Sequence, residues 1–207
     1  MKKFLINIKR VLECLTQRIV LPLKSELLVL PLRIKKGRNV KFIGETILRT
    51  YSNGKIIIGD NVVFNSSNKK NLVGLTGPTI VCAQCNAEIS IGANSGFSSV
   101  VINAMDGIRI GENVNIGGNV RIFDHDFHPL DWKDRRLPEK RDNIRKLPVC
   151  IGDDVFVGTN AIILKGTRIG DRSIIAAGSV VFGLDIPPDS MVKGNPAQLV
   201  PRNNKAK

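Results

Sequence analysis

The sequence predicts an all-β protein built as a parallel β-helix, and a six-residue repeat is the main reason. Six apolar residues follow one another at intervals of six without an exception, and glycine follows three of them. A period of six fits neither an α-helix nor an alternating strand, and it is typical of a parallel β-helix. Three units close a coil of about eighteen residues, and stacked coils bury aliphatic rows that one unit leaves exposed. The run consists of Ile151, Val157, Ile163, Ile169, Ile175 and Val181.

The same frame extends toward the N-terminus with decreasing regularity. It passes through Ile110, Ile116 and Ile122 and is weaker before them. Glycine after the aliphatic residue suits a corner where the chain bends sharply and backbones approach closely. We therefore expect the β-helix to occupy residues 40–183 and a C-terminal extension to follow over residues 184–207.

Composition limits the class of protein. The 207 residues are 43% apolar but only 5% aromatic, which fits one sizeable domain with a core of stacked Ile and Val. The net charge of +13 is concentrated in residues 1–41, which hold eleven Lys or Arg and two Glu. Because there is no nucleic-acid-binding motif and little aromatic stacking material, this charge does not indicate a nucleic-acid partner.

Residues 1–39 are expected to form a basic amphipathic helical arm. No stretch in the arm approaches the ~18 apolar residues that a membrane span needs. Two roles stay open, a cap over the first coil and a helix that lies on an anionic membrane face through residues 1–36. We expect a cytoplasmic protein, and the second role adds peripheral contact at the inner membrane face. Helical spacing is seen at Leu5, Ile8, Leu12, Leu15 and Ile19, before Pro22 and Pro31 interrupt it.

The four cysteines suggest no disulfide framework, which favours a reducing compartment. Cys14, Cys82, Cys85 and Cys150 are scattered, and only Cys82 and Cys85 have C-x-x-C spacing. A single such pair is weak evidence for zinc, so thiols packed into a coil corner are the favoured interpretation. No metal is expected.

One long interruption, residues 123–150, cannot fit the six-residue grid. It contains both histidines, the single Trp and many charges, and a long excursion from a solenoid is usually functional. A histidine can accept a proton near neutral pH and return it later, while a carboxylate holds its tautomer. The candidate catalytic residues are Asp124, His125, Asp126 and His128.

The repeats, the loop segment Phe127–Asp131 and the segment Asp185–Ala197 resemble the hexapeptide-repeat acyltransferases. This family includes maltose and galactoside acetyltransferases and polysaccharide O-acetyltransferases. The resemblance covers about half of the chain closely and most of the rest loosely. It implies left-handed coils, a homotrimer with an active site between neighbouring subunits, and acetyl-CoA as the acyl donor.

The resemblance also implies roles for particular residues. A loop histidine of the family acts as general base on the acceptor hydroxyl, and His128 matches it best because Pro129 follows. His125, Asp124 and Asp126 would then orient the base or bind the acceptor, and an altered loop register would exchange the two histidines. Late coil turns and basic residues would bind CoA, namely Gly158, Thr159, Ala176, Ala177, Lys193 and Arg202. The candidates for acceptor binding are Asn103, Asp106 and Trp132.

The expected activity is transfer of an acetyl group to a sugar hydroxyl, on a surface polysaccharide or its lipid-linked precursor. N-acetylation of an amino sugar or a xenobiotic is the alternative within the same class. A γ-class carbonic anhydrase needs three histidine ligands, and the chain has two. A non-catalytic β-helix scaffold would leave the interruption at residues 123–150 without a purpose.

Overall fold

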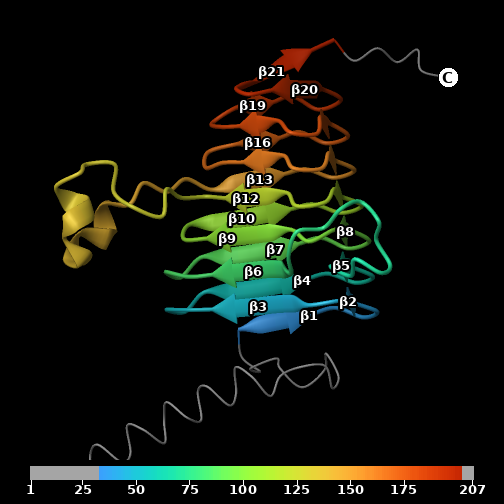
Figure 1. Ribbon diagram of the computed structural model, residues 1–207, viewed down its shortest axis with the longest axis horizontal. Coiled ribbons are helices and arrows are strands. Elements are labelled where there is room, and N and C mark those ends of the chain that lie inside the picture. The colour runs from blue at the N-terminus through green and yellow to red at the C-terminus, as the bar shows by residue number, and fades with distance from the viewer. Residues whose placement is uncertain (1–32, 202–207) are drawn as a thin grey trace, which may run out of the picture. The chain divides into compact units, whose positions relative to one another are not determined.

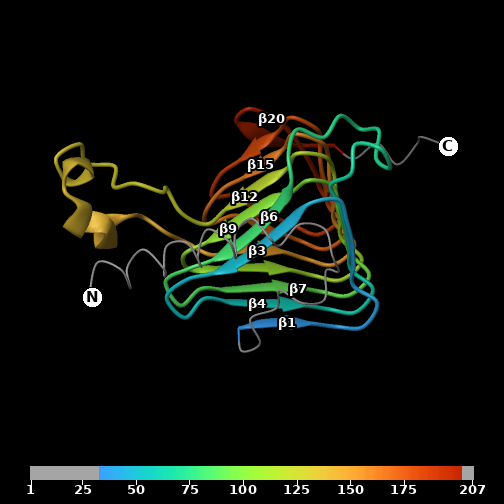
Figure 2. The same ribbon diagram turned by 60° about the horizontal axis from the view of Figure 1, so that its bottom comes forward.

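Short strands and tight corners make up residues 33–201, the part of the chain that the computed structural model describes. With one exception at the C-terminal end, each strand pairs in parallel with the strand three places along the chain, so three sheets form the three sides of every coil (Figures 1 and 2). The predicted parallel β-helix is therefore confirmed.

The three sheets, here called A, B and C, take every third strand. Sheet A contains β1 (Ile34–Lys36), β4 (Lys55–Ile58), β7 (Glu88–Ile91), β10 (Gly107–Ile110), β13 (Val149–Ile151), β16 (Arg168–Ile169) and β19 (Asp185–Ile186). Sheet B contains β2 (Lys41–Ile43), β5 (Val63–Asn65), β8 (Gly96–Phe97), β11 (Asn115–Ile116), β14 (Phe156–Val157), β17 (Ile174–Ile175) and β20 (Met191–Gly194), with β21 (Ala197–Val200) antiparallel to β20. Sheet C contains β3 (Thr46–Thr50), β6 (Thr79–Ala83), β9 (Val101–Ala104), β12 (Arg121–Phe123), β15 (Ile162–Ile163) and β18 (Val180–Val181).

The six-residue run supplies the core, one residue to each sheet in turn. Ile151 lies opposite Ile169 in sheet A, one coil of eighteen residues later. Every member of the run is buried, which confirms the predicted inward-facing row. The first coils differ from the expectation of an Ile and Val core, because Phe42, Phe64 and Phe97 stack there with ring centroids 5.4 and 5.0 Å apart.

Asparagine and glycine have different roles at the corners between sheets A and B. Asn61, Asn94 and Asn113 adopt the left-handed backbone that turns the chain, with φ between 57° and 60°. Gly111, two residues before Asn113, serves close approach instead. A Cβ atom there would lie 2.2 Å from the Asp153 carboxylate and 2.7 Å from the backbone of the next coil. The predicted close approach at glycine is confirmed, whereas the bend belongs to asparagine.

We expect Gly111→Ala to lower the free energy of unfolding by about 1–3 kcal/mol, the usual cost of overpacking. The added methyl group must displace backbone and the Asp153 side chain, because both lie closer than a van der Waals contact. Gly77→Ala is the matched control, since nothing lies within 4 Å of its Cβ position. Urea unfolding of both variants checks the prediction, and equal midpoints would contradict it.

The β-helix extends further at both ends than expected. β1 pairs with β4, so the first coil begins at Ile34, inside the segment assigned to the arm. At the other end β19 and β20 continue sheets A and B beyond residue 183. The six-residue frame does not identify the first coil, because Lys36, which lies opposite Ile58, occupies the position of the aliphatic residue. The rest of the expected arm, residues 1–32, lies outside the described residues.

Two long loops leave the coils. The predicted excursion is confirmed between β12 and β13, and it carries the 3-10 helices η1 (Asp134–Arg136) and η2 (Pro138–Asn143). A second loop, residues 66–78 between β5 and β6, was not predicted. The two loops lie at opposite ends of sheet C (Figure 2). Within residues 33–201, no helix is long and apolar enough to cross a membrane.

Candidate active site

The Asp124 side chain anchors the start of the excursion loop to the coils. Its carboxylate is completely buried and accepts hydrogen bonds from three successive backbone amides, those of Met105, Asp106 and Gly107, at 2.7–2.8 Å. It also lies 2.8 Å from His125 Nδ1. Four donors satisfy this buried carboxylate, so it can stay in place as an anion.

His125 is held by that carboxylate in one orientation. An ionised carboxylate only accepts, so Nδ1 carries the proton and Nε2 carries the lone pair. Nε2 is buried, and no other described residue forms a hydrogen bond with it. The Phe127 ring, 38% exposed, lies against the imidazole with centroids 4.3 Å apart. This is a histidine with an oriented tautomer and an unused basic nitrogen, the arrangement that a general base requires.

A short two-stranded ribbon holds the loop at its base. His125 pairs with Lys146 in an antiparallel bridge, and Leu147 N donates to Asp124 O at 2.9 Å. Asp126 N donates to the backbone of Arg145 at 3.1 Å. The ribbon therefore fixes Asp124, His125 and Asp126 against the coils, while the rest of the loop projects from them (Figure 1).

Asp126 contacts the next coil rather than His125. Its carboxylate forms an ion pair with Lys165, which is itself 4.7 Å from the Phe182 ring centroid. One oxygen of Asp126 is buried and forms no hydrogen bond within the described residues. Lys165 was missed at the sequence level, although its position in the corner after β15 is the same corner that carries the excursion one coil earlier.

His128 lies away from Asp124 and His125, contrary to the expectation that His128 is the general base. Phe127 has φ of 62°, so the chain turns after His125 and His128 becomes exposed. Within residues 33–201 its side chain has no hydrogen bond or ion pair. This geometry favours the alternative in which His125, and not His128, is the general base.

The three acceptor candidates lie in different surroundings. Asn103 lies in β9 opposite Phe123, one coil before His125, and its side-chain oxygen accepts from Gln84 at 2.9 Å. Asp106 is exposed and adjoins the carboxylate of Asp124 only through its backbone N–H. Trp132 is 53% exposed in the projecting loop and contacts Lys133 and Arg136 instead.

The donor candidates gather at the other end of sheet C. Gly158 and Thr159 follow β14, and Ala176 and Ala177 follow β17. The two pairs therefore stack along the edge formed by the successive corners between sheets B and C, here called the corner column. Gly158 is required by the coil itself, because a Cβ atom there would lie 2.5 Å from Ala177 N. Lys193 is exposed in β20, in the next coil. Arg202 lies outside the described residues.

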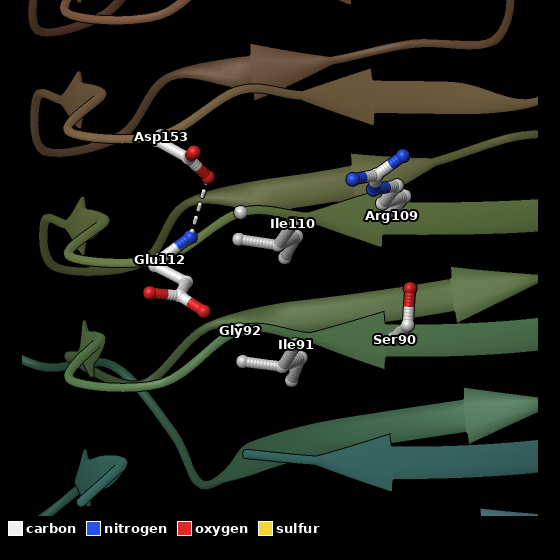
Figure 3. Close-up of a pocket in the computed structure, with 8 residues that line it drawn as sticks. Ser90, Ile91, Gly92, Arg109, Ile110, Glu112 and Asp153 are labelled. Carbon is white, nitrogen blue, oxygen red and sulfur yellow. Dashed lines mark hydrogen bonds between the residues drawn. The ribbon is translucent and has the colours of Figure 1, made fainter. Parts of the chain in front are cut away.

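A hollow of about 260 Å³ lies at another corner, beside sheet A (Figure 3). Arg109 of β10 and Ser90 of β7 face it, and the Glu112 N–H donates to Asp153 at 2.8 Å. None of the residues predicted for the site lines it. The hollow is therefore separate from the histidine corner and from the donor corner.

The C-x-x-C pair lies where a coil corner was expected. Cys82 is buried in β6, and Cys85 lies in the turn that follows, with φ of 55°. Burial raises the pKa of the Cys82 thiol, and the charge of Arg49 opposes this in part. Among residues 33–201, no three His, Cys, Asp or Glu side chains are grouped to hold a metal ion.

Comparison with known proteins identifies the repeat. A family model described as the hexapeptide repeat of succinyl-transferase matches residues 148–182. The match covers the coils from β13 to β18 and supports the predicted resemblance to hexapeptide-repeat proteins. The left-handed form of the β-helix expected from the sequence is thereby confirmed together with the parallel coils.

The relatives of this chain include acetyltransferases of two kinds. The galactoside O-acetyltransferase of Escherichia coli is 33% identical over 116 residues, which are 55% of this chain and 54% of that protein. The 2,3,4,5-tetrahydropyridine-2,6-dicarboxylate N-acetyltransferase of Clostridium perfringens is 49% identical over 55 residues, 27% of this chain and 23% of that protein. The chain spans about half the length, or less, of these curated relatives.

A solved structure extends the likeness to three dimensions. It is galactoside acetyltransferase in complex with coenzyme A, 30% identical and with a TM-score of 0.50. The alignment covers 69% of this chain and 64% of that one.

Proposed function

We propose that this protein is an acetyl-CoA-dependent acetyltransferase in which His125 is the general base. The observation that carries the proposal is the buried Asp124–His125 pair, which leaves Nε2 free to accept a proton. The hexapeptide-repeat match and the coenzyme A complex of a similar protein support the choice of donor. The favoured acceptor is a sugar hydroxyl, by likeness to the galactoside enzyme.

The chemistry needs one base and no covalent enzyme intermediate. Nε2 of His125 accepts the hydroxyl proton as the acceptor oxygen attacks the thioester carbonyl. The carbon–sulfur bond then breaks, the proton passes from the imidazolium to the CoA sulfur, and the ester and free CoA leave. Such proton transfer contributes about 10²–10⁴-fold to the rate. Asp124 stabilises the imidazolium that forms in between.

The acceptor must reach a nitrogen that is buried in the single chain. The Phe127 ring is the partly exposed group against the imidazole, so its displacement would open the way to Nε2. Lys165, paired with Asp126 beside this corner, is a further group that the acceptor would meet.

The histidine and the donor corner lie at opposite ends of sheet C, which supports a site completed by a second copy. In a homotrimer whose axis follows the coil axis, His125 of one copy would face the donor corner of its neighbour. Such closed rotational symmetry gives three equal sites. We therefore propose a homotrimer as the assembly that completes the site.

N-acetylation is the second candidate, because one relative of this chain is an N-acetyltransferase. An amine acceptor also loses a proton, so the same base would serve it. A membrane-bound sugar precursor remains the proposed source of the acceptor for an arm as basic as residues 1–36. Vesicle binding by the full chain, compared with a chain lacking residues 1–36, tests that part.

We expect Ala177→Trp to abolish CoA binding, since the indole would fill the corner column beside Gly158 and Thr159. Ala177 is exposed, so the larger side chain is accommodated without disturbing the core. Ala93→Trp is the matched control, because Ala93 lies in a corner between sheets A and B. Calorimetry with acetyl-CoA measures both variants. Loss of binding in the control alone, or no binding by the wild type, would contradict the proposal.

A further inference from the structure

Loop 66–78 is the part of the coil region that the proposed function has not used. Ordinary corners between sheets B and C take four residues or fewer, whereas this one takes thirteen. It leaves the coil after β5 and rises along the corner toward later coils (Figure 1). A loop held there lies on the same corner column as the donor candidates Gly158 and Thr159.

Specific hydrogen bonds fix this loop to the column. Asn119 accepts from the backbone N–H and the hydroxyl of Thr76 at 2.9 and 3.1 Å, and it donates to Gly74 O at 3.0 Å. Lower on the column, Asn71 donates to Ser98 Oγ at 2.9 Å. The loop is therefore anchored at two coils, and its course over the corner is defined.

Two apolar side chains of the loop cover Gly118. A Cβ atom on Gly118 would meet Val73 Cγ1 at 2.9 Å and Leu75 Cδ2 at 3.4 Å, and Thr159 Cγ2 at 3.7 Å from the next coil. Leu75 is buried, while Val73 stays 46% exposed. Val73 thus presents an apolar surface beside Gly118, where the Thr159 methyl group of the next coil also lies.

The order of the coils places the acyl group of the donor near that surface. Lys193, Ala177, Thr159 and Gly118 belong to four successive coils, which rise about 4.8 Å each, or about 14 Å in three steps. With the nucleotide at Lys193 and the pantetheine arm over Ala177 and Thr159, the thioester reaches the coil of Gly118. His125 follows β12 of that same coil by two residues, so the base and the thioester would share one height.

We infer that Val73 packs against the acyl group of the donor and limits its length to short chains. The inference rests on the proposed function, since it needs the donor in the corner column. Val73 is assigned here as a specificity-determining residue, not as a catalytic one. The ligand class is a CoA thioester with a small acyl group, and each added methylene would press against Val73 and Leu75.

The test compares acetyl-CoA and butyryl-CoA, with dissociation constants measured by calorimetry on the full chain. Wild type is expected to bind acetyl-CoA more tightly. Val73→Ala is expected to shift the ratio of the two constants about tenfold toward butyryl-CoA, the usual effect of one or two methylenes in an apolar pocket. Val73→Phe is expected to shift it the other way. Ile57→Ala is the matched control, because Ile57 is 37% exposed on sheet A.

The outcomes separate the inference from the proposal beneath it. An unchanged ratio in both Val73 variants, with acetyl-CoA still bound, overturns the inference and leaves the acetyltransferase in place. A wild type that binds neither thioester overturns both. A shift in Ile57→Ala as large as in Val73→Ala also overturns the role assigned to Val73.

Discussion

His125→Ala is expected to lower kcat for acetyl transfer by about 10²–10⁴-fold, the contribution of a positioned general base. The alanine is expected to leave CoA binding close to wild type, because the proposed donor contacts are made by the corner residues after β14 and β17 and not by the imidazole. His128→Ala is the matched control and is expected to keep kcat close to wild type, since His128 is exposed and unpaired within residues 33–201. Thiol release at saturating acetyl-CoA measures both variants.

The same pair of variants can also contradict the assignment. A large loss in His128→Ala with little loss in His125→Ala would return the base to the residue that the family resemblance favoured. Such a result would mean that the loop beyond Phe127 refolds when a neighbouring copy or a substrate contacts it.

Ile56→Ala is expected to lower the free energy of unfolding by about 2–5 kcal/mol, because the side chain is completely buried between coils. Ile57→Ala, the next residue of β4, is expected to cost about 1 kcal/mol or less, because that side chain faces outward. Urea unfolding followed by circular dichroism measures the difference. Equal losses would contradict the alternation of inner and outer faces on which the core depends.

The regular coils could be predicted from the sequence because the position of a residue within its six-residue unit determines whether its side chain faces the core. Ile151 and Ile169 are identical in type, eighteen residues apart and opposite each other in sheet A. The first coil could not be found in this way. Strand β1 carries Lys36 opposite Ile58, where the later coils carry the aliphatic residue of the six-residue frame.

The candidate site was predictable in composition but not in geometry. The pattern placed Asp124, His125 and His128 in one loop, and it could not show which histidine the buried carboxylate would hold. That choice depends on the backbone amides of residues 105–107 one coil earlier and on the turn at Phe127. Loop 66–78 left only a gap in the repeat, and its contact with Gly118 is visible only in three dimensions.

Transfer of a labelled acetyl group to a sugar tests the central claim most directly. The full chain is incubated with labelled acetyl-CoA and a panel of sugars, some with hydroxyl groups only and some with amines, and the products are examined by mass spectrometry. The account predicts labelled ester on a sugar that has only hydroxyl groups with wild type, and none with His125→Ala. Label confined to amines would make the protein an N-acetyltransferase. No labelled product from any acceptor with wild type would contradict the account.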